Sequence, residues 1–385
     1  MEVKQIYNIV NDVTKEILGE TNIVTENLEN VVDIGTEIFS ATSVDNYVRT
    51  LVDHIGKVIF VNRPYAGIAP RVLMDSWEFG SVLEKISVDL PEAVENESWE
   101  LNDNQQYVQD VFKKPKVSAK FFNKRVTFDI DISITDRQVK SSFSSLDQLN
   151  SFLSMIYNAV DKSLTVKIDG LVMRAINNMI GETIHNEIPE SSNYSTTSTV
   201  KAVNLLKLYN DKFGTSLTVV KCMNDKEFLR YASGIFELYK SRMARISTLF
   251  NVGGKDRFTP SDMLHVILLA DFKVGANTYL QSDTFNDEFT ALPNAEVVPY
   301  WQGSGTDYSF NNISNIHINT ASGNEVSISG IIGVMFDRDA LGVSCLDRRV
   351  TAHYNAKAEF TNNFYKFDAG YFNDLNENFV VFFVA

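Results

Sequence analysis

Asp337 and Asp339 have the spacing of a paired-carboxylate site. In a strand the two side chains would share one face, as a metal site or an acid/base pair requires. Arg338 lies between them, and Asp347-Arg-Arg349 follows shortly, so cations are close in sequence to both acids. Short patterns of this kind often arise without function. We therefore interpret the two acids as partners in ion pairs at the end of a turn.

The other residues that could do chemistry are scattered along the chain. The sequence lacks the motifs Gly-x-x-x-x-Gly-Lys-Ser/Thr, His-Glu-x-x-His and Gly-x-Ser-x-Gly. The glycine pair before Lys255 has no strand before it and no helix after it, which predicts a flexible loop. The five histidines show no metal-ligand spacing: His54, His185, His265, His317 and His353. The sequence thus predicts no catalytic residue, no metal and no cofactor.

The composition is that of an ordinary globular protein, with 44% apolar and 22% charged residues. A net charge of -14 disfavours general nucleic-acid binding, which needs a positive surface. Cys222 and Cys345 are too few and too far apart for a disulfide framework or a zinc site, so we expect buried free thiols. No apolar run approaches the roughly 18 residues of a membrane helix, and the first residues lack signal-peptide features. We therefore expect a protein made in a reducing cytoplasm, with no membrane partner.

A long helix over residues 145–181 is the element best able to position the rest. Its apolar residues recur at helical spacing and trace one face: Leu149, Phe152, Ile156, Val160, Leu164, Ile168, Leu171, Ala175 and Met179. Ser145 and Gln148 have capping-box spacing, and Gly181 predicts the C-terminal end. At 1.5 Å per residue the helix would be about 50 Å long. Such a length predicts a spine that crosses an extended subunit.

Residues 76–135 predict a long hairpin with oppositely charged limbs. We expect its turn at Asn102-Asp-Asn104, and residues 126–134 alternate with the period of a strand. Within one copy the limbs would pair across strands, and between copies they would dock one loop on a neighbour. By charge alone, an ordinary solvated hairpin is the simpler interpretation. The acidic limb holds Glu92, Glu95, Glu97, Glu100 and Asp103, and the basic limb holds Lys113, Lys114, Lys116, Lys120, Lys124 and Arg125.

The two ends of the chain have different patterns. Residues 1–40 are helix-patterned, with eight acids and two bases, and predict either an acidic arm or a surface helical subdomain. A strand is expected at residues 58–62. The run at residues 379–384 is apolar and rich in β-formers. We expect residues 380–384 to close a sheet that packs on helix residues 149–180.

Beyond residue 198, helical and strand patterns alternate, which predicts a compact α/β domain. The helical patterns cover residues 198–213 and 225–249, and the strand patterns cover residues 216–221, 265–270, 296–300 and 313–320.

Several strings, in this order along the chain, resemble a known family: Asp75–Gly80, Leu90–Asn96, Tyr279–Phe285, Val298–Gln302, Gly333–Ala340 and Tyr354-Asn355. The chain also has a characteristic order of parts: an arm, a charged hairpin, a long helix, an α/β domain and the final strands. Both features resemble the tailed-phage major capsid proteins with the Hong Kong 97-like fold, particularly those of phages of Gram-positive hosts. The similarity covers about residues 40–385 and lies in the collinearity of the strings.

The resemblance implies an α+β fold made of five parts. These are an N-terminal arm at 1–60, an extended-loop hairpin with flanking strands at 61–135, a peripheral domain with a spine helix at 136–195, an axial α/β domain at 196–325, and a return to the peripheral domain with the C-terminal strand at 326–385.

The resemblance also implies a structural protein that is not an enzyme. Hexamers and pentamers of the chain would form an icosahedral shell around double-stranded phage DNA, without sequence-specific binding. The eleven charged residues of the two hairpin limbs are the predicted contacts between subunits. A portal and a separate scaffolding protein are the other expected partners, and assembly in the bacterial cytoplasm would place the protein in the virion. The alternatives are an encapsulin-like compartment shell and, more distantly, a soluble enzyme with two α/β parts.

Overall fold

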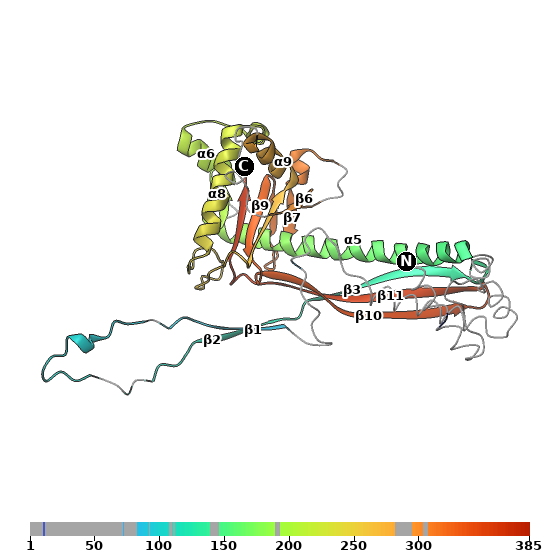
Figure 1. The fold of residues 1–385 in the computed structure, drawn as a ribbon, viewed down its shortest axis with the longest axis horizontal. Helices are drawn as coiled ribbons and strands as arrows, with labels where there is room; N and C mark the ends of the chain where they lie inside the picture. The colour runs from blue at the N-terminus through green and yellow to red at the C-terminus, as the bar shows by residue number, and fades with distance from the viewer. Residues whose placement is uncertain are drawn as a thin grey trace. The chain divides into compact units, whose positions relative to one another are not determined.

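A computed structural model of the chain describes residues 11, 72, 83–91, 93–107, 110, 112–138, 146–188, 193–281, 295–302 and 307–385, without the side chains of 97, 146–155, 157, 158 and 279–281. Apart from residue 11, the predicted arm and the strand expected at 58–62 lie outside these residues. The chain divides into two compact units (Figure 1). Among the described residues, the first unit holds Arg125–Val172 and Val343–Gly370, and the second holds Gly80–Lys124, Met173–Gly342 and Tyr371–Ala385.

The predicted long helix is confirmed as α5 (Leu146–Glu187), whose 42 residues contribute to both units. It continues past Gly181, so the predicted end at that glycine is wrong. The glycine serves packing instead, because a Cβ at position 181 would collide with the side chain of Ile318. The missing side chain therefore lets strand β7 (Ile316–Asn319) approach the helix closely.

The first unit contains a three-stranded sheet in the order β10-β11-β3. Strand β3 (Arg125–Thr135) pairs antiparallel with β11 (Phe360–Asn373), and β10 (Leu341–Asn355) lies on the other side of β11. Phe128 and Phe367 face each other across the β3–β11 pair, with ring centroids 4.8 Å apart. Burial alternates along both strands, so the sheet has one buried face, as the period of two at residues 126–134 predicts.

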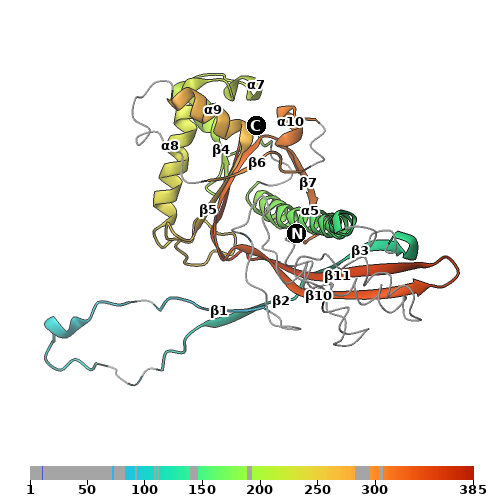
Figure 2. The ribbon, with the colours of Figure 1, turned by 45° about the vertical axis from the view of Figure 1, so that its right-hand side comes forward.

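The second unit is built on a five-stranded sheet in the order β4-β12-β9-β5-β6. Its strands are β4 (Ala202–Asn204), β12 (Phe379–Phe383), β9 (Ile331–Asp337), β5 (Leu264–Leu269) and β6 (Glu296–Val298). Strand β12 runs parallel to β4 and antiparallel to β9, and β5 runs antiparallel to β9 and parallel to β6. In Figure 2, α8 lies on one side of this sheet and β7 on the other.

Helices of the second unit share one hydrophobic core with this sheet. Asn204 caps α6 by accepting a hydrogen bond from the Lys207 amide, and Asp225 caps α8 in the same way at Phe228. The helices are α6 (Leu205–Phe213), α7 (Val219–Cys222), α8 (Lys226–Met243), α9 (Ala270–Gln281) and α10 (Phe310–Ile313).

Two predictions in this region need correction. The strand expected at residues 216–221 is wrong, because Val219–Cys222 forms a turn of helix in which Cys222 is buried and Val220 is exposed. The helix expected from residue 198 begins only at Leu205, after the short strand β4. The strands expected near residues 265 and 296 are confirmed as β5 and β6.

The final strand is confirmed, but its expected place is wrong. Strand β12 does not close a sheet on helix residues 149–180; it lies between β4 and β9 in the sheet of the second unit. All five of its side chains are buried, so both faces of the strand are covered. A continuous apolar run suits such an inner position, with elements packed on both sides. Segment 326–385 is thus shared between the units, since β9 and β12 belong to the second and most of β10 and β11 to the first.

Two antiparallel hairpins complete the second unit. Strand β7 pairs with β8 (Glu325–Ile328), and β1 (Leu83–Val88) pairs with β2 (Val117–Phe122). The antiparallel β1–β2 pair confirms the predicted hairpin, whose two strands are joined by the segment between Val88 and Val117. A short 3-10 turn (Glu97–Trp99) lies in the segment that joins its strands.

Candidate functional site

The β1–β2 hairpin has an unusual distribution of side chains over its two faces. Lys85 lies directly opposite Lys120 in the antiparallel register, and both are half-buried. The other face carries Ile86, Val88, Val117 and Phe121, and all four are exposed. Alternation along a strand makes these two faces distinct. The hairpin therefore turns its two lysines toward its own unit, and its other face exposes these apolar side chains together with Glu84.

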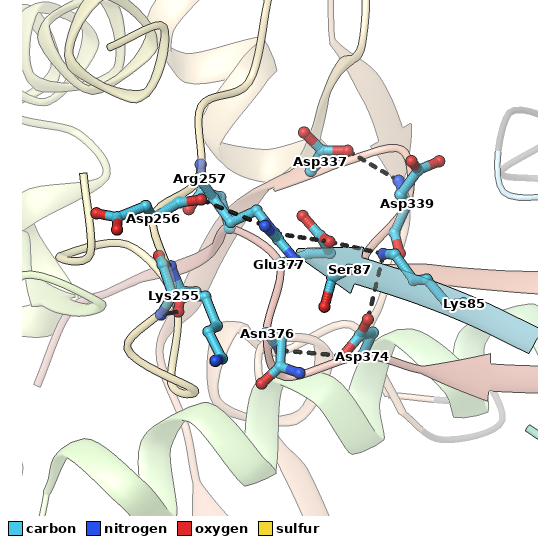
Figure 3. A network of polar contacts seen from close by, with 12 residues as sticks. Lys85, Ser87, Lys255, Asp256, Arg257, Asp337, Asp339, Asp374, Asn376 and Glu377 are labelled. Carbon is cyan, nitrogen blue, oxygen red and sulfur yellow. Dashed lines mark hydrogen bonds and ion pairs between the residues drawn. The ribbon is translucent and has the colours of Figure 1, made fainter. Parts of the chain in front are cut away.

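Two buried acids of the same unit hold the inward lysines, and Figure 3 shows those acids beside Lys85. Asp374 lies 2.8 Å from Lys120 Nζ, and its side chain is only 3% exposed. The same acid lies 3.2 Å from Lys85 Nζ. Glu377 lies 2.7 Å from Lys85 Nζ and 3.0 Å from Arg257 Nε. Lys85 also donates a hydrogen bond to the carbonyl oxygen of Asp339. The contacts of the two lysines join residues more than 250 positions apart and fasten the base of the hairpin to its unit.

The charge of Asp374 is stabilised by its surroundings. Burial alone raises the pKa of this carboxyl, but the hydrogen bonds from Lys120 and the Asn376 amide and the charges of Lys85 and Lys120 outweigh it. The pKa of Asp374 therefore lies below its usual value. A second ion pair, between Asp89 Oδ1 and Lys255 Nζ at 2.8 Å, lies nearby but is more exposed. The hydrogen bond from Lys255 lowers the pKa of Asp89 as well.

Among the described residues, no acid of the predicted acidic limb faces a cation of the basic limb across strands, because β1 ends at Val88, before that limb begins. Lysine faces lysine in the β1–β2 register, and Glu84 faces Phe121. Lys120 is used within the subunit, in the pair with Asp374. Glu92 lies outside the described residues, as does the side chain of Glu97, and Arg125 opens β3 in the first unit. The remaining predicted residues are exposed: Glu95, Glu100, Asp103, Lys113, Lys114, Lys116 and Lys124.

The segment between β1 and β2 also exposes large apolar side chains that the charge pattern did not suggest. Trp99 is 95% exposed and Phe112 is 87% exposed. Leu90, Val94 and Leu101 are exposed in the same segment. Single exposed apolar residues are common, whereas large apolar patches are typical of interaction surfaces. The signal was visible in the sequence, since aromatic residues interrupt two charged runs, yet only their exposure gives it meaning.

The residues first considered for chemistry have structural roles. Asp337 accepts hydrogen bonds from Thr259 Oγ1 (2.7 Å) and from the Asp339 amide (2.9 Å), which confirms a turn. Among the described residues no cation pairs with the carboxylate of Asp337 or Asp339, so the ion pairing expected of these two acids is wrong. In the neighbouring run Arg349 does pair with Asp347, at 2.9 Å. His265 stacks on Phe336, and His317 pairs with Glu325 at an exposed edge.

Within the described ranges, no three His, Cys, Asp or Glu side chains come together as metal ligands would. No helix in the described part of the chain has the length and apolarity to cross a membrane.

Several known proteins are similar to this chain in sequence. A family model described as Phi29-like phage major capsid protein matches residues 10–383. The major capsid protein of Bacillus phage B103 is 26% identical over 169 residues, or 43% of this chain and 36% of that protein. The major capsid protein of Bacillus phage GA-1 is 23% identical over 193 residues, or 49% of this chain and 40% of that protein. The matches thus span about two fifths of these relatives' length.

A solved structure shares the mixed helix-and-sheet fold. It is a chain from the structure of the head fiber and inner core protein gp22 of native bacteriophage P68. The TM-score is 0.50 and the sequence identity 9%, with 84% of this chain and 86% of that chain covered.

Proposed function

The chain belongs to the family of Phi29-like phage major capsid proteins, and we propose that many copies of it form the closed shell of a phage head. The observation that carries this proposal is the apolar outer face of the β1–β2 hairpin together with exposed Trp99 and Phe112. Apolar surface of this kind is stabilised when a second protein covers it. Self-association of identical copies supplies that partner without any further component.

The finer arrangement that we propose follows the Hong Kong 97-like plan. The β1–β2 hairpin is the extended loop, α5 is the spine helix, the unit with the three-stranded sheet is peripheral, and the unit with the five-stranded sheet is axial. Hexamers and pentamers close an icosahedral shell around double-stranded DNA, and a portal and a separate scaffolding protein take part in assembly in the host cytoplasm. The net charge of -14 supports this role, because an acidic wall does not adhere to packaged DNA.

The aromatic side chains of the loop give the most direct test. We expect Trp99→Ala and Phe112→Ala each to lower the yield of closed shells at least tenfold, because buried aromatic anchors dominate interface energies. The melting temperature of the soluble subunit should not change, since both side chains are exposed. Electron microscopy and thermal melting measure the two quantities. Ser98→Ala, in the same 3-10 turn, is the matched control and should assemble normally.

Normal shells from both aromatic variants would contradict the role assigned to the loop. Purified wild-type chain that forms no closed shells, with or without a scaffolding protein, would contradict the proposed function itself. Nuclease-protected DNA inside shells from infected cells would distinguish a genome container from a compartment that holds enzymes.

The exposed lysines of the loop are proposed to guide one copy onto an acidic surface of the next. Reversing three charges with Lys113→Glu, Lys114→Glu and Lys116→Glu should slow assembly and reverse its dependence on salt, because the new glutamates repel the acidic surface and salt screens that repulsion. Light scattering at several salt concentrations measures both effects. The subunit should still fold, since all three side chains are exposed. Unchanged assembly kinetics would remove these lysines from the contact.

A further inference from the structure

An open groove of about 710 Å³ lies between α7, α9 and α10 in the second unit. Its walls are mainly apolar, and Val220 and Val274 are largely exposed to solvent. Asp271 is the one charged residue among those that line it. Burial beside these apolar side chains raises the pKa of Asp271, and among the described residues no cation pairs with it. The further lining residues are Val219, Met223, Asn224, Ala270, Gly275, Thr278, Ser309, Phe310 and Asn311.

The loop that follows the C-terminal end of α8 has apolar side chains and a charge opposite to that of the groove. Residues 244–258 expose three large apolar side chains, Ile246, Leu249 and Phe258, each more than half exposed. Arg245 is exposed beside them, and within the described ranges it has no acid as an ion-pair partner. The loop thus combines an apolar tip with a positive charge, where the groove combines apolar walls with a negative charge.

Hydrogen bonds hold this loop in one conformation, in contrast to the flexible loop that its glycine pair predicted. Ser247 and Arg257 exchange two backbone hydrogen bonds at its base. The Asn251 side chain bonds both the amide and the carbonyl oxygen of Lys255. Gly253 lies against Asn376, where a Cβ would collide with the Asn376 side chain. A loop fixed in this way loses little conformational freedom when it binds.

The groove and the loop lie at opposite ends of one helix. Helix α7 immediately precedes α8, and the 244–258 loop immediately follows α8 (Figure 2). The 18 residues of α8 span about 27 Å at 1.5 Å per residue. The loop of one copy therefore cannot enter its own groove, but it can enter the groove of another copy.

We propose that residues 244–258 of one copy dock into the α7–α9–α10 groove of the next, so that copies join head to tail. The contact rests on the proposed function, and it deepens that proposal by naming two surfaces that close a capsomer ring. Repeating such a heterologous contact produces a ring when the rotation closes. Groove-to-groove pairing is disfavoured, because it would bring two Asp271 carboxylates together in an apolar setting.

Paired cysteines test the contact directly. The background carries Cys345→Ser, whereas Cys222 can stay, because burial raises its pKa to about 12 and keeps it a protonated, inaccessible thiol. Leu249→Cys and Val274→Cys are then combined in one chain and treated with a short bis-maleimide during assembly. We expect a ladder of covalent oligomers that stops at the size of the ring. Each single variant should stay monomeric, since a head-to-tail contact brings unlike positions together.

Charge exchange gives an independent readout. Asp271→Arg and Arg245→Asp should each lower the shell yield at least tenfold, and the double variant should recover most of it. The cross-linking control replaces Val274→Cys with Val166→Cys, a similarly exposed valine of α5, and should give no ladder with Leu249→Cys. Shells that form without a ladder or charge rescue would overturn this contact and leave the proposed function intact. A ladder from chains that never form shells would support the contact and count against the proposed function.

Discussion

Deletion of residues 380–385 is expected to abolish cooperative folding of the second unit. Strand β12 lies between β4 and β9, so its loss separates β4 from the other three strands of this sheet. Its side chains are fully buried, and Val380, Phe382 and Val384 belong to the main hydrophobic core. The apolar area lost exceeds what a domain of marginal stability can tolerate. Circular dichroism and calorimetry of the truncated chain measure the outcome.

A single substitution in the same strand gives a graded version of this result. Phe382 packs against Phe236 and Tyr239, with ring centroids 4.3 Å and 5.2 Å away. We expect Phe382→Ala to lower the free energy of unfolding by about 3–5 kcal/mol, because it leaves a cavity in a close-packed core. Phe112→Ala removes the same side chain from an exposed position and should leave stability unchanged. A truncated chain that melts cooperatively near the full-length temperature would refute the role of β12.

Asp374→Asn is expected to release the base of the hairpin. The carboxylate is 3% exposed and forms ion pairs with both Lys85 and Lys120. The substitution removes this negative charge and leaves the two lysines close together. We expect the free energy that holds the hairpin to its unit to fall by about 2–3 kcal/mol. This is less than the cost of breaking a fully buried ion pair, because both lysines still reach solvent. Hydrogen exchange at the amides of β1 and β2 should accelerate, since the strands lose their attachment. Asp89→Asn is the matched control on the same hairpin, and its more exposed pair with Lys255 should matter little.

The pH dependence of this attachment follows from the pKa of Asp374. The pKa is lowered in the folded state, so the stabilisation is complete above the unfolded value of about 4. It should be lost as the pH falls below that value and through the folded pKa. Hydrogen exchange at the amides of β1 and β2, corrected for its intrinsic pH dependence, measures the effect. In Asp374→Asn the pH dependence that comes from this carboxyl should disappear. Release of the hairpin between pH 5 and 7 would contradict the assignment.

Local patterns in the sequence predicted the elements that depend on local physics. The apolar stripe predicted α5, because a face repeated every 3.6 residues has a single helical interpretation over so many residues. The alternation at residues 126–134 predicted β3 for the same kind of reason. The error at Gly181 shows the limit, since its role depends on Ile318, a residue far along the chain. Local pattern cannot distinguish a glycine that ends a helix from one that admits a neighbour.

The surface that we propose as the contact between copies could be predicted from the sequence only in part. The sequence identified the hairpin and its charges, but it assigned Lys120 to a neighbouring copy, whereas the structure pairs it with Asp374. It did not identify Trp99 and Phe112, because exposure is a property of the packed molecule and not of a residue type. The sequence also did not identify the groove or the 244–258 loop as a pair of surfaces. Their separation by the length of α8, which lets them meet only between copies, is a property of the folded chain.

The sequence by itself determined that this chain forms an α+β protein with a long helix, a charged hairpin and a buried final strand, and that it resembles capsid proteins. Only the tertiary structure decided which sheet receives β12 and which face of the hairpin meets its own unit. The physical reason is that periodicity reports whether a residue is buried, whereas the choice of partner depends on free energies summed over contacts far apart in sequence. Lys85 and Glu377 lie almost 300 residues apart, and no local pattern around either one names the other.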